Sequence, residues 1–344
     1  MPRLIFLMGV LLVSSHQAFG EFVFKETFDG YLDGSKANQN IKEADKSTAP
    51  VIWTDEAYTK IASPEKVKSL PGLKDLSVKT NPKITANSIA RTGTSQAGLL
   101  FTYKEGIGSW SEQRFKLNQD VLGKKGLSEI WIQYDMFIPS NFRPLDAKPT
   151  SDNTFGGGHK VLALYADGYS APNSTMIFGQ AFARKDLNGV PGYDGNAYRG
   201  GTLSTYKNGE RIYTQLGIDE SRAKAWIFAD IDRGKWQRRT VHFKFPTSET
   251  SNDGKIEVWI LRDNGVIDEL VKVHGGSFYG FNQNYFNAGY FNGWCNDGLD
   301  GETYFFLDNV IITDNSANLD AGAFGETAVA LSNRPMVPQG AHIN

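Results

Sequence analysis

The residues best suited to acid–base chemistry stand where a glycine turn enters an apolar strand. His159 and Lys160 follow the glycines 156–158 and precede the apolar run 161–165. Histidine titrates near neutral pH, and the pKa of a lysine falls towards neutrality when its ammonium group is desolvated. Successive residues of a strand point to opposite sides of the sheet, so His159 and Lys160 should lie on opposite sides. The pattern indicates a polar groove on a β-sheet and makes carbohydrate chemistry the first hypothesis.

Amide, cationic, phenolic and aromatic side chains accompany this strand. They are Gln113 and Arg114 upstream, Tyr165 at its end, and Gln180, Arg184, Tyr193, Tyr198 and Trp294 downstream. This set suits β-elimination from a uronic acid. A cation or amide neutralises the carboxylate, a base removes the α-proton at C5, and an acid such as tyrosine protonates the departing glycosidic oxygen. An aromatic ring would give the sugar a surface on which to stack.

Period-two alternation predicts the strands that must position these groups. In 129–139 the residues Ile130, Ile132, Tyr134, Met136 and Ile138 fall on one face. The run 235–245 alternates in the same way, and helical periodicity is weak and confined to 219–226. No repeat of fixed period occurs, and helices do not alternate with strands. The sequence therefore predicts an all-β fold, a jelly-roll β-sandwich of two antiparallel sheets.

The expected organisation is a signal peptide at 1–20, one β domain at 21–314 and a loosely held tail at 315–344. Within the domain, the stretch 31–98 reads as an irregular decoration or lid. The runs 22–28 and 304–312 both read as strands, so we expect the two ends of the domain to be neighbours.

The charge and composition of the chain exclude some classes of binding partner. The formal net charge of −2 argues against a nucleic-acid binder, which needs a basic field. Beyond the leader, no run reaches the roughly 20 apolar residues of a membrane helix. Cys295 is the single cysteine, so no intramolecular disulfide forms, and we expect its side chain to be buried. We expect a secreted or periplasmic monomer that acts on an anionic polysaccharide.

Several familiar catalytic patterns are absent from the sequence. There is no Gly-x-Ser-x-Gly, no His-Glu-x-x-His and no Glu-x-Asp-x-x-Glu run, so an esterase, a zinc hydrolase and a laminarinase-type glycosidase lack support. No cofactor is required. Glu26, Asp29 and Asp308 form a weak candidate for a structural calcium site where the first and last strands meet, although their sequence context is also that of ordinary turns.

In motif order, the chain resembles the jelly-roll polysaccharide lyases of the alginate and glucuronan lyase kind, especially polysaccharide lyase family fourteen, within the concanavalin A-like superfamily. The motifs that carry the resemblance are the strand ending at Pro139, Gly158–Tyr165, Gly234-Lys235-Trp236, Asp253-Gly254, Val258-Trp259-Ile260 and Phe306–Val310. The resemblance spans 98–313. Most of these motifs belong to the scaffold that lectin-like sandwiches share.

The resemblance implies roles for three residues. The family's essential lysine matches Lys160, its arginine matches Arg184, and its catalytic tyrosine matches Tyr198. Two departures stand out: Leu162-Ala163 replaces the family's Pro-Gly, and Asn196 stands where a second tyrosine is frequent. Tyr193 could stand in for that tyrosine. The family motif does not say whether His159 or Lys160 faces the groove.

Each candidate also has a structural interpretation. Lys160 could be a solvated strand lysine, Arg184 a surface ion pair, and Tyr193 and Tyr198 packing groups in a glycine-rich loop. Gln113 and Arg114 could be an exposed strand face or a uronate clamp, and Trp294 either core or a stacking surface. His242 and His274 are expected to be structural. The alternatives to a lyase are therefore a non-catalytic lectin-like protein and, with less support, a glycoside hydrolase.

The first testable prediction is a mature N-terminus close to Glu21. Arg3 precedes the apolar run 4–13, and Ala18 and Gly20 are the small residues that a signal peptidase requires before its cut. Intact-mass measurement of the exported protein should therefore give the mass of a chain without its first 20 residues. A mass that retains Met1 would contradict the prediction.

Overall fold

The computed structural model describes residues 21–28, 33–37, 48–76, 97–106, 109–142, 159–166, 175–182, 198–207, 210–215, 233–248, 250–262, 266–276, 285–295 and 298–320. Only the backbone is described at positions 55–57, 159–160, 175–182, 198–207 and 210–215 and at most of 268–276. The expected leader at 1–20, the weakly helical run at 219–226 and the tail beyond Asp320 lie outside these residues. In the part of the chain that is described, no helix is long and apolar enough to cross a membrane.

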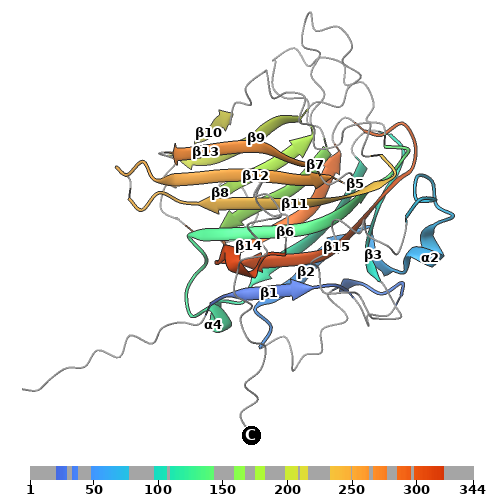
Figure 1. Cartoon of the computed structure of the whole chain (residues 1–344), viewed down its shortest axis with the longest axis horizontal. Coiled ribbons are helices and arrows are strands. Elements are labelled where there is room, and N and C mark those ends of the chain that lie inside the picture. The colour runs from blue at the N-terminus through green and yellow to red at the C-terminus, as the bar shows by residue number, and fades with distance from the viewer. Residues whose placement is uncertain are drawn as a thin grey trace, which may run out of the picture.

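Two antiparallel sheets form the protein, as the alternation predicted (Figure 1). The eight-stranded sheet has the order β13 (Ile267–Gly276), β12 (Gly254–Arg262), β11 (Lys235–Lys244), β6 (Glu129–Ile138), β15 (Thr303–Thr313), β4 (Gly98–Tyr103) and β3 (Thr59–Ala62), with β1 (Val23–Glu26) also paired to β15. The seven-stranded sheet has the order β10 (Glu210–Gln215), β9 (Tyr198–Lys207), β8 (Thr175–Phe182), β7 (His159–Ala166), β14 (Ala288–Cys295), β5 (Ser109–Leu117) and β2 (Val51–Ala57).

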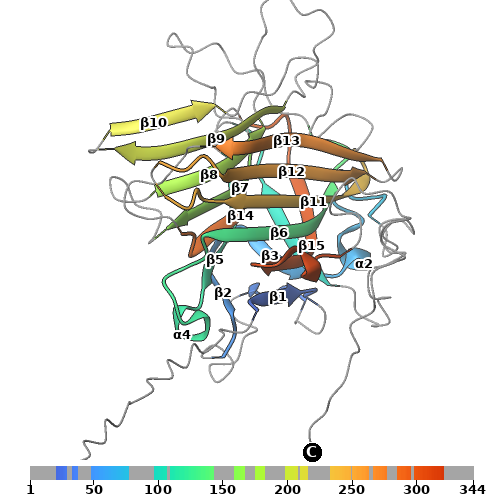
Figure 2. The ribbon, with the colours of Figure 1, turned by 60° about the vertical axis from the view of Figure 1, so that its left-hand side comes forward.

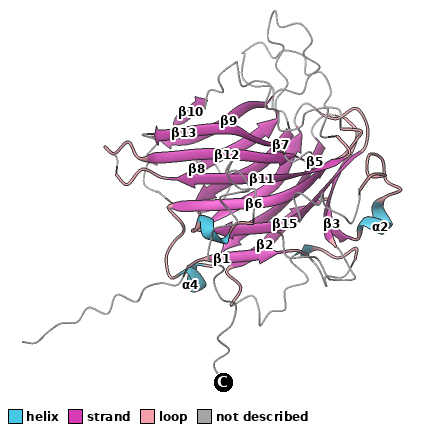
Figure 3. Cartoon of the chain, in the orientation of Figure 1, coloured by secondary structure: helices cyan, strands magenta, loops and turns pink. Residues whose placement is uncertain are grey.

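The two sheets lie face to face, with the strands of one running across those of the other (Figures 1 and 2). Among the described residues, helix is confined to the short α2 (Pro64–Val67) and α4 (Gln119–Leu122), a 3-10 turn at Ser316–Asn318 and a 3-10 conformation at Ala37 (Figure 3). The all-β jelly-roll sandwich is therefore confirmed.

The core lies between the sheets and uses the alternating faces that the sequence predicted. From β6 it takes Ile130, Ile132, Tyr134, Met136 and Ile138, and from β11 it takes Val241 and Phe243. The opposite face of β6 carries Trp131, Gln133, Asp135 and Phe137. Burial of one apolar row per strand is the main driving force for pairing the sheets.

The ends of the domain meet, as the sequence predicted, because β1 pairs with β15 from Val23↔Thr313 to Glu26↔Val310. The first residues of the expected tail are also held. Asp320 N–H donates to Gln133 Oε1 at 2.9 Å, and Lys25 Nζ lies 3.6 Å from Asp320 Oδ1. Up to Asp320, the chain therefore belongs to the sandwich.

The stretch 31–98 differs from the irregular decoration that we expected. Residues 51–62 supply β2 and β3, which are edge strands of the two sheets. The following segment, 62–76, does act as a cover. Val67, Leu73 and Leu76 pack on the outer side of the eight-stranded sheet against Phe137, Trp236 and Phe306.

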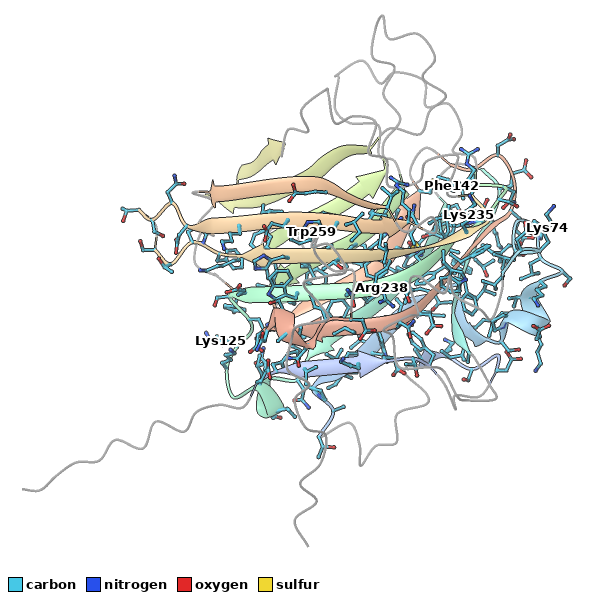
Figure 4. The ribbon with its side chains drawn as sticks, in the orientation of Figure 1. Lys74, Lys125, Phe142, Lys235, Arg238 and Trp259 are labelled. Atoms are coloured by element: carbon cyan, nitrogen blue, oxygen red, sulfur yellow. The ribbon has the colours of Figure 1, made fainter. Side chains whose placement is uncertain are left out.

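A buried ion pair lies on the outer side of the eight-stranded sheet, where Arg238 of β11 pairs in register with Asp135 of β6 (Figure 4). Nε and Nη2 of Arg238 donate to the two carboxylate oxygens at 2.7 and 2.9 Å, and Asn309 Nδ2 donates to Asp135 Oδ2 at 2.6 Å. Burial lowers the pKa of Arg238, but the charge of Asp135 outweighs it and the pKa is raised. The guanidinium group of Arg238 therefore stays charged.

The second prediction concerns this pair. Arg238→Ala should lower the free energy of unfolding by about 3–5 kcal/mol, because it leaves the Asp135 carboxylate buried without its counter-ion. Chemical denaturation measures the loss. Lys235→Ala, at an exposed position of the same strand (Figure 4), is the matched control and should change stability by less than about 0.5 kcal/mol. Equal midpoints for the two variants would contradict the role of the pair.

Candidate functional site

The outer face of the seven-stranded sheet, which points away from the core, carries three of the candidate residues, Arg114, Tyr165 and Trp294. Strands β5, β14 and β7 are neighbours there, so their outward side chains form cross-strand rows. The rows are Trp110–Trp294, Glu112–Asn292, Arg114–Tyr290–Ala163 and Lys116–Ala288–Tyr165. One face thus combines an aromatic end with a polar middle.

The aromatic end consists of two tryptophans stacked across the strands. The ring centroids of Trp110 and Trp294 are 5.2 Å apart and their planes differ by 4°. Trp294 is 40% exposed, so the core position that its sequence context favoured is wrong, and the alternative of a surface ring holds. Cross-strand aromatic pairs stabilise a sheet, and here the pair also leaves ring surface open to solvent.

Tyr58 extends this aromatic surface from the corner between β2 and β3. Its ring meets Trp110 edge-on, at 6.3 Å and 82°, and the residue is 59% exposed. Lys104 Nζ lies 5.7 Å from the centre of the tyrosine ring, within reach of a cation–π contact. We call Tyr58, Trp110 and Trp294 the aromatic platform.

The hydroxyl group of Tyr103 bridges β5 and β14 by hydrogen bonds beneath this platform. It lies 2.7 Å from Ser111 O and 2.9 Å from Gly293 O, and it accepts a hydrogen bond from Gly293 N–H at 3.2 Å. Ser111 and Gly293 are the neighbours of Trp110 and Trp294 in the chain. Burial raises the pKa of Tyr103 well above its usual range, so the phenol remains protonated.

The backbone around the platform departs from regular strand geometry. Tyr58 and Asn292 have φ angles of 52° and 55°, in the left-handed region that residues other than glycine seldom occupy. The ladder between β14 and β7 is irregular between Phe291 and Cys295, and this irregular stretch carries Trp294. Such irregularities re-aim side chains and are frequent beside functional sites.

Arg114 and Gln113, which the sequence placed side by side, lie on opposite faces of β5. Arg114 is on the outer face, and its Nε donates to Glu112 Oε1 at 2.5 Å. Gln113 is fully buried and bonds within the protein: Thr59 Oγ1 donates to its Oε1, and its Nε2 donates to Thr54 O and Arg114 O. Of the two, Arg114 alone shares the face of the tryptophans.

Tyr165 packs on the same outer face. It forms a small buried cluster with Tyr290, Ala163 and Ala288, and the two tyrosine rings are 6.4 Å apart. Cys295 is fully buried, as expected, and its Sγ lies 3.4 Å from Gly298 O.

The backbone register places the remaining candidates on adjoining strands. His159 of β7 pairs with Cys295 of β14 and with Phe182 of β8, and Lys160 pairs with Ala181. Gln180 of β8 pairs with Leu162, and Tyr198, the first residue of β9, pairs with Phe182. Arg184 and Tyr193 lie outside the described residues. The positions of His159, Lys160 and Tyr198 thus meet at one end of the sheet.

The expected structural histidine, His242, lies on the other sheet between two carboxylates. Its Nδ1 is 2.5 Å from Glu257 Oε2, its Nε2 is 2.9 Å from Glu129 Oε1, and its ring stacks on Trp131. The His242 hydrogen bond lowers the pKa of Glu129 against the opposing effect of burial. His274 lies in β13, where the backbone is described.

The proposed calcium ligands are only partly described. The Glu26 carboxylate accepts from Phe28 N–H at 2.7 Å, Asp308 accepts from Asn309 N–H at 2.7 Å, and Asp29 lies outside the described residues. In the described ranges, no group of three or more Asp, Glu, His or Cys side chains lies where it could hold a metal ion. The calcium site stays a prediction.

No family model and no curated protein matches the chain. Several solved structures are similar to it. The alginate lyase Aly36B is 12% identical, with 84% of this chain and 96% of that chain covered and a TM-score of 0.48. The PL-14 alginate lyase from Aplysia kurodai is 11% identical, covers 84% and 97%, and has a TM-score of 0.44.

A GH131 β-glucanase catalytic domain from Podospora anserina is 13% identical, with 85% and 95% covered and a TM-score of 0.41. The similarity to jelly-roll alginate lyases that the motifs indicated is therefore found over most of the chain. The matches include proteins named for a lyase and for a glucanase, so they do not distinguish between these reactions.

The sequence did not single out Trp110, Tyr58 or Lys104. A signal for Trp110 exists, because it has the same parity in β5 as Arg114 and the opposite parity to the core residues Phe115 and Leu117. Tyr58 and Lys104 carry no comparable local signal. They reach the platform through the pairing of strands distant in the sequence.

The third prediction tests the fastening role of Tyr103. Tyr103→Phe keeps the ring that packs on Phe305 at 5.9 Å but removes the hydroxyl, leaving the polar groups of Gly293 and Ser111 buried and unpaired. Stability should fall by about 1–3 kcal/mol. The near-ultraviolet circular dichroism of the stacked tryptophans should weaken as well. Unchanged stability together with an unchanged tryptophan signal would contradict this role.

Proposed function

We propose that the chain is a secreted polysaccharide lyase that cleaves a uronic-acid-containing polysaccharide, such as alginate or glucuronan, by β-elimination. The reaction would take place on the outer face of the seven-stranded sheet. The observation that carries the proposal is the register of β7 with β14, because this register sets the position of Lys160 along the sheet relative to Trp294 and Arg114.

The register supports an outward Lys160. Paired residues on neighbouring strands share a face of the sheet. Cys295 belongs to the core and pairs with His159, so we expect His159 to face the core and Lys160 to face outwards. The ladder between β7 and β8 shifts between Lys160 and Leu162, and both Val161 and Leu162 are core residues. Such a bulge lets Lys160 share the outer face with Ala163 and Tyr165.

The chemistry follows from these groups. The cation of Lys160, aided by Arg114 or Arg184, would neutralise the uronate carboxylate and so acidify the proton at C5. A base takes that proton, and Lys160 is the candidate for this role if Arg114 or Arg184 alone neutralises the carboxylate. The electron pair of the C–H bond forms the C4–C5 double bond, and the C4–O bond breaks. The departing oxygen receives a proton, a role that the family resemblance gives to Tyr198. No external oxidant or reductant is needed.

Tyr198 has a different register from Lys160. It pairs with Phe182, which also pairs with His159, and this would place it in the core-facing row. It is, however, the first residue of β9, where strand alternation constrains direction least, and the ladder to β8 is irregular between Gln180 and Phe182. Tyr193 is the alternative proton carrier.

The second candidate function is carbohydrate binding without turnover. The specific observation in its favour is the aromatic platform, which suits a sugar and contributes no acid or base. A glycoside hydrolase has less support. On the described outer face, the row residue Glu112 is 3% exposed and paired with Arg114.

The fourth prediction follows from the proposed roles. The wild-type protein, incubated with alginate and glucuronan, should generate the unsaturated product, measured by the ultraviolet absorbance of its conjugated double bond. Lys160→Ala and Tyr198→Phe should each lower the rate by about 10²–10⁴-fold without a matching loss in melting temperature.

The outcomes separate the candidates. Binding of uronans without any unsaturated product would favour the lectin-like function. Cleavage that survives Lys160→Ala but not His159→Ala would show that our register argument for β7 is wrong. Cleavage that survives Tyr198→Phe but not Tyr193→Phe would move the proton transfer to Tyr193.

A further inference from the structure

The exposed aromatic side chains of the described residues lie together in the aromatic platform. Among the described residues, the large exposed hydrophobic side chains are Val23, Val121, Val266, Tyr58 and Trp294. The two aromatic members of this set both contact Trp110, one by stacking and one edge-on. Clustered exposed aromatic rings on a soluble domain mark a binding surface more often than scattered ones do.

The platform offers the two kinds of contact that an acidic sugar needs. The apolar C–H face of a pyranose ring packs on a flat aromatic ring such as that of Trp294 or Tyr58. Lys104, beside Tyr58, supplies a cation for the carboxylate of a uronic acid. The three rings are in contact from Trp294 through Trp110 to Tyr58, with centroid distances of 5.2 and 6.3 Å, so the exposed rings at the two ends belong to one cluster.

The platform also adjoins the position proposed for catalysis. Trp294 immediately precedes Cys295, which pairs with His159, and Lys160 follows His159. In an antiparallel pair, such residues are cross-strand neighbours. A polymer that stacks on Trp294 would therefore continue towards Lys160, with Tyr58 and Lys104 at the far end of the bound segment.

We propose that Tyr58, Trp110, Trp294 and Lys104 form a subsite that binds uronosyl units of the polysaccharide next to the unit that is cleaved. The inference rests on the proposed function and deepens it by joining Tyr58, Trp110 and Lys104, which neither the sequence motifs nor the fold similarity assigned, to the sequence candidate Trp294. The subsite binds and orients the chain, and takes no part in proton transfer.

The fifth prediction uses three variants matched to this geometry. Trp294→Ala removes the exposed ring, and Lys104→Gln removes the charge but keeps a polar side chain that is only one atom shorter. Tyr58→Asn removes the second ring and places a residue that tolerates positive φ at this left-handed position. Lys125→Ala is the charge control: Lys125 is exposed and follows α4, beyond the opposite end of β5 from Trp110 (Figure 4).

Binding is measured by affinity electrophoresis in gels that contain alginate, glucuronan or a neutral β-glucan, with every variant built on Lys160→Ala so that the polymer stays intact. Trp294→Ala and Tyr58→Asn should each weaken uronan binding about tenfold. Lys104→Gln should weaken uronan binding and reduce its salt dependence. Lys125→Ala should bind as its parent does. Uronan binding unchanged in all three variants would overturn the proposal, as would retardation by the neutral glucan alone.

Kinetics on the otherwise wild-type chain distinguish this failure from failure of the proposed function. Because stacking acts equally on the bound substrate and on the transition state, the platform variants should raise KM about tenfold and leave kcat nearly unchanged. Unsaturated product with an unchanged KM in Trp294→Ala would overturn the subsite and leave the lyase standing. Uronan binding that depends on Trp294, without product from the wild type, would support the subsite and reject the lyase.

Discussion

The pairing of β14 with β5 on one side and β7 on the other is the constraint on which the candidate site depends. It sets Trp294 against Trp110, Tyr290 against Arg114 and Ala163, and His159 against Cys295. A slip of one residue would turn each outward side chain towards the core and each core side chain outwards. The core positions Phe291 and Cys295 make such a slip costly, and the Tyr103 hydroxyl fixes β5 and β14 at the point where the ladder becomes irregular.

Local sequence patterns predicted those parts of the fold in which burial repeats every second residue. Strands β6 and β11 were found from their alternation because every residue on one face meets the core. Strands β2 and β3 were missed because they are short edge strands. The run Thr54-Asp55-Glu56 in β2 gives no apolar alternation, and β3 has only four residues. What holds them is pairing with β5 and β4, which is not visible in their own sequence.

The site was less predictable than the fold, because it depends on register and on bulges. Adjacent residues of a strand cannot share a face, so the proposed joint role of Gln113 and Arg114 conflicted with alternation from the start. Simple alternation also fails at Val161, because Val161 and Leu162 are consecutive and both belong to the core, next to a shift in the ladder between β7 and β8. That shift is visible only in the pairing of β7 with its neighbouring strands. Tyr58 reaches Trp110 by the same long-range pairing.

The two outer faces of the sandwich also differ in what they leave open. On the eight-stranded sheet, Trp131, Trp259, Arg238 and His242 are all buried. Arg238 pairs with Asp135, and His242 lies between Glu129 and Glu257. The segment 62–76 covers a further part of that face. On the seven-stranded sheet, Trp294 and Tyr58 remain exposed, and Lys104 lies beside the ring of Tyr58. Among the described residues, burial of aromatic and charged groups stabilises the outer face of one sheet, whereas the outer face of the other holds stacked aromatic rings open to solvent.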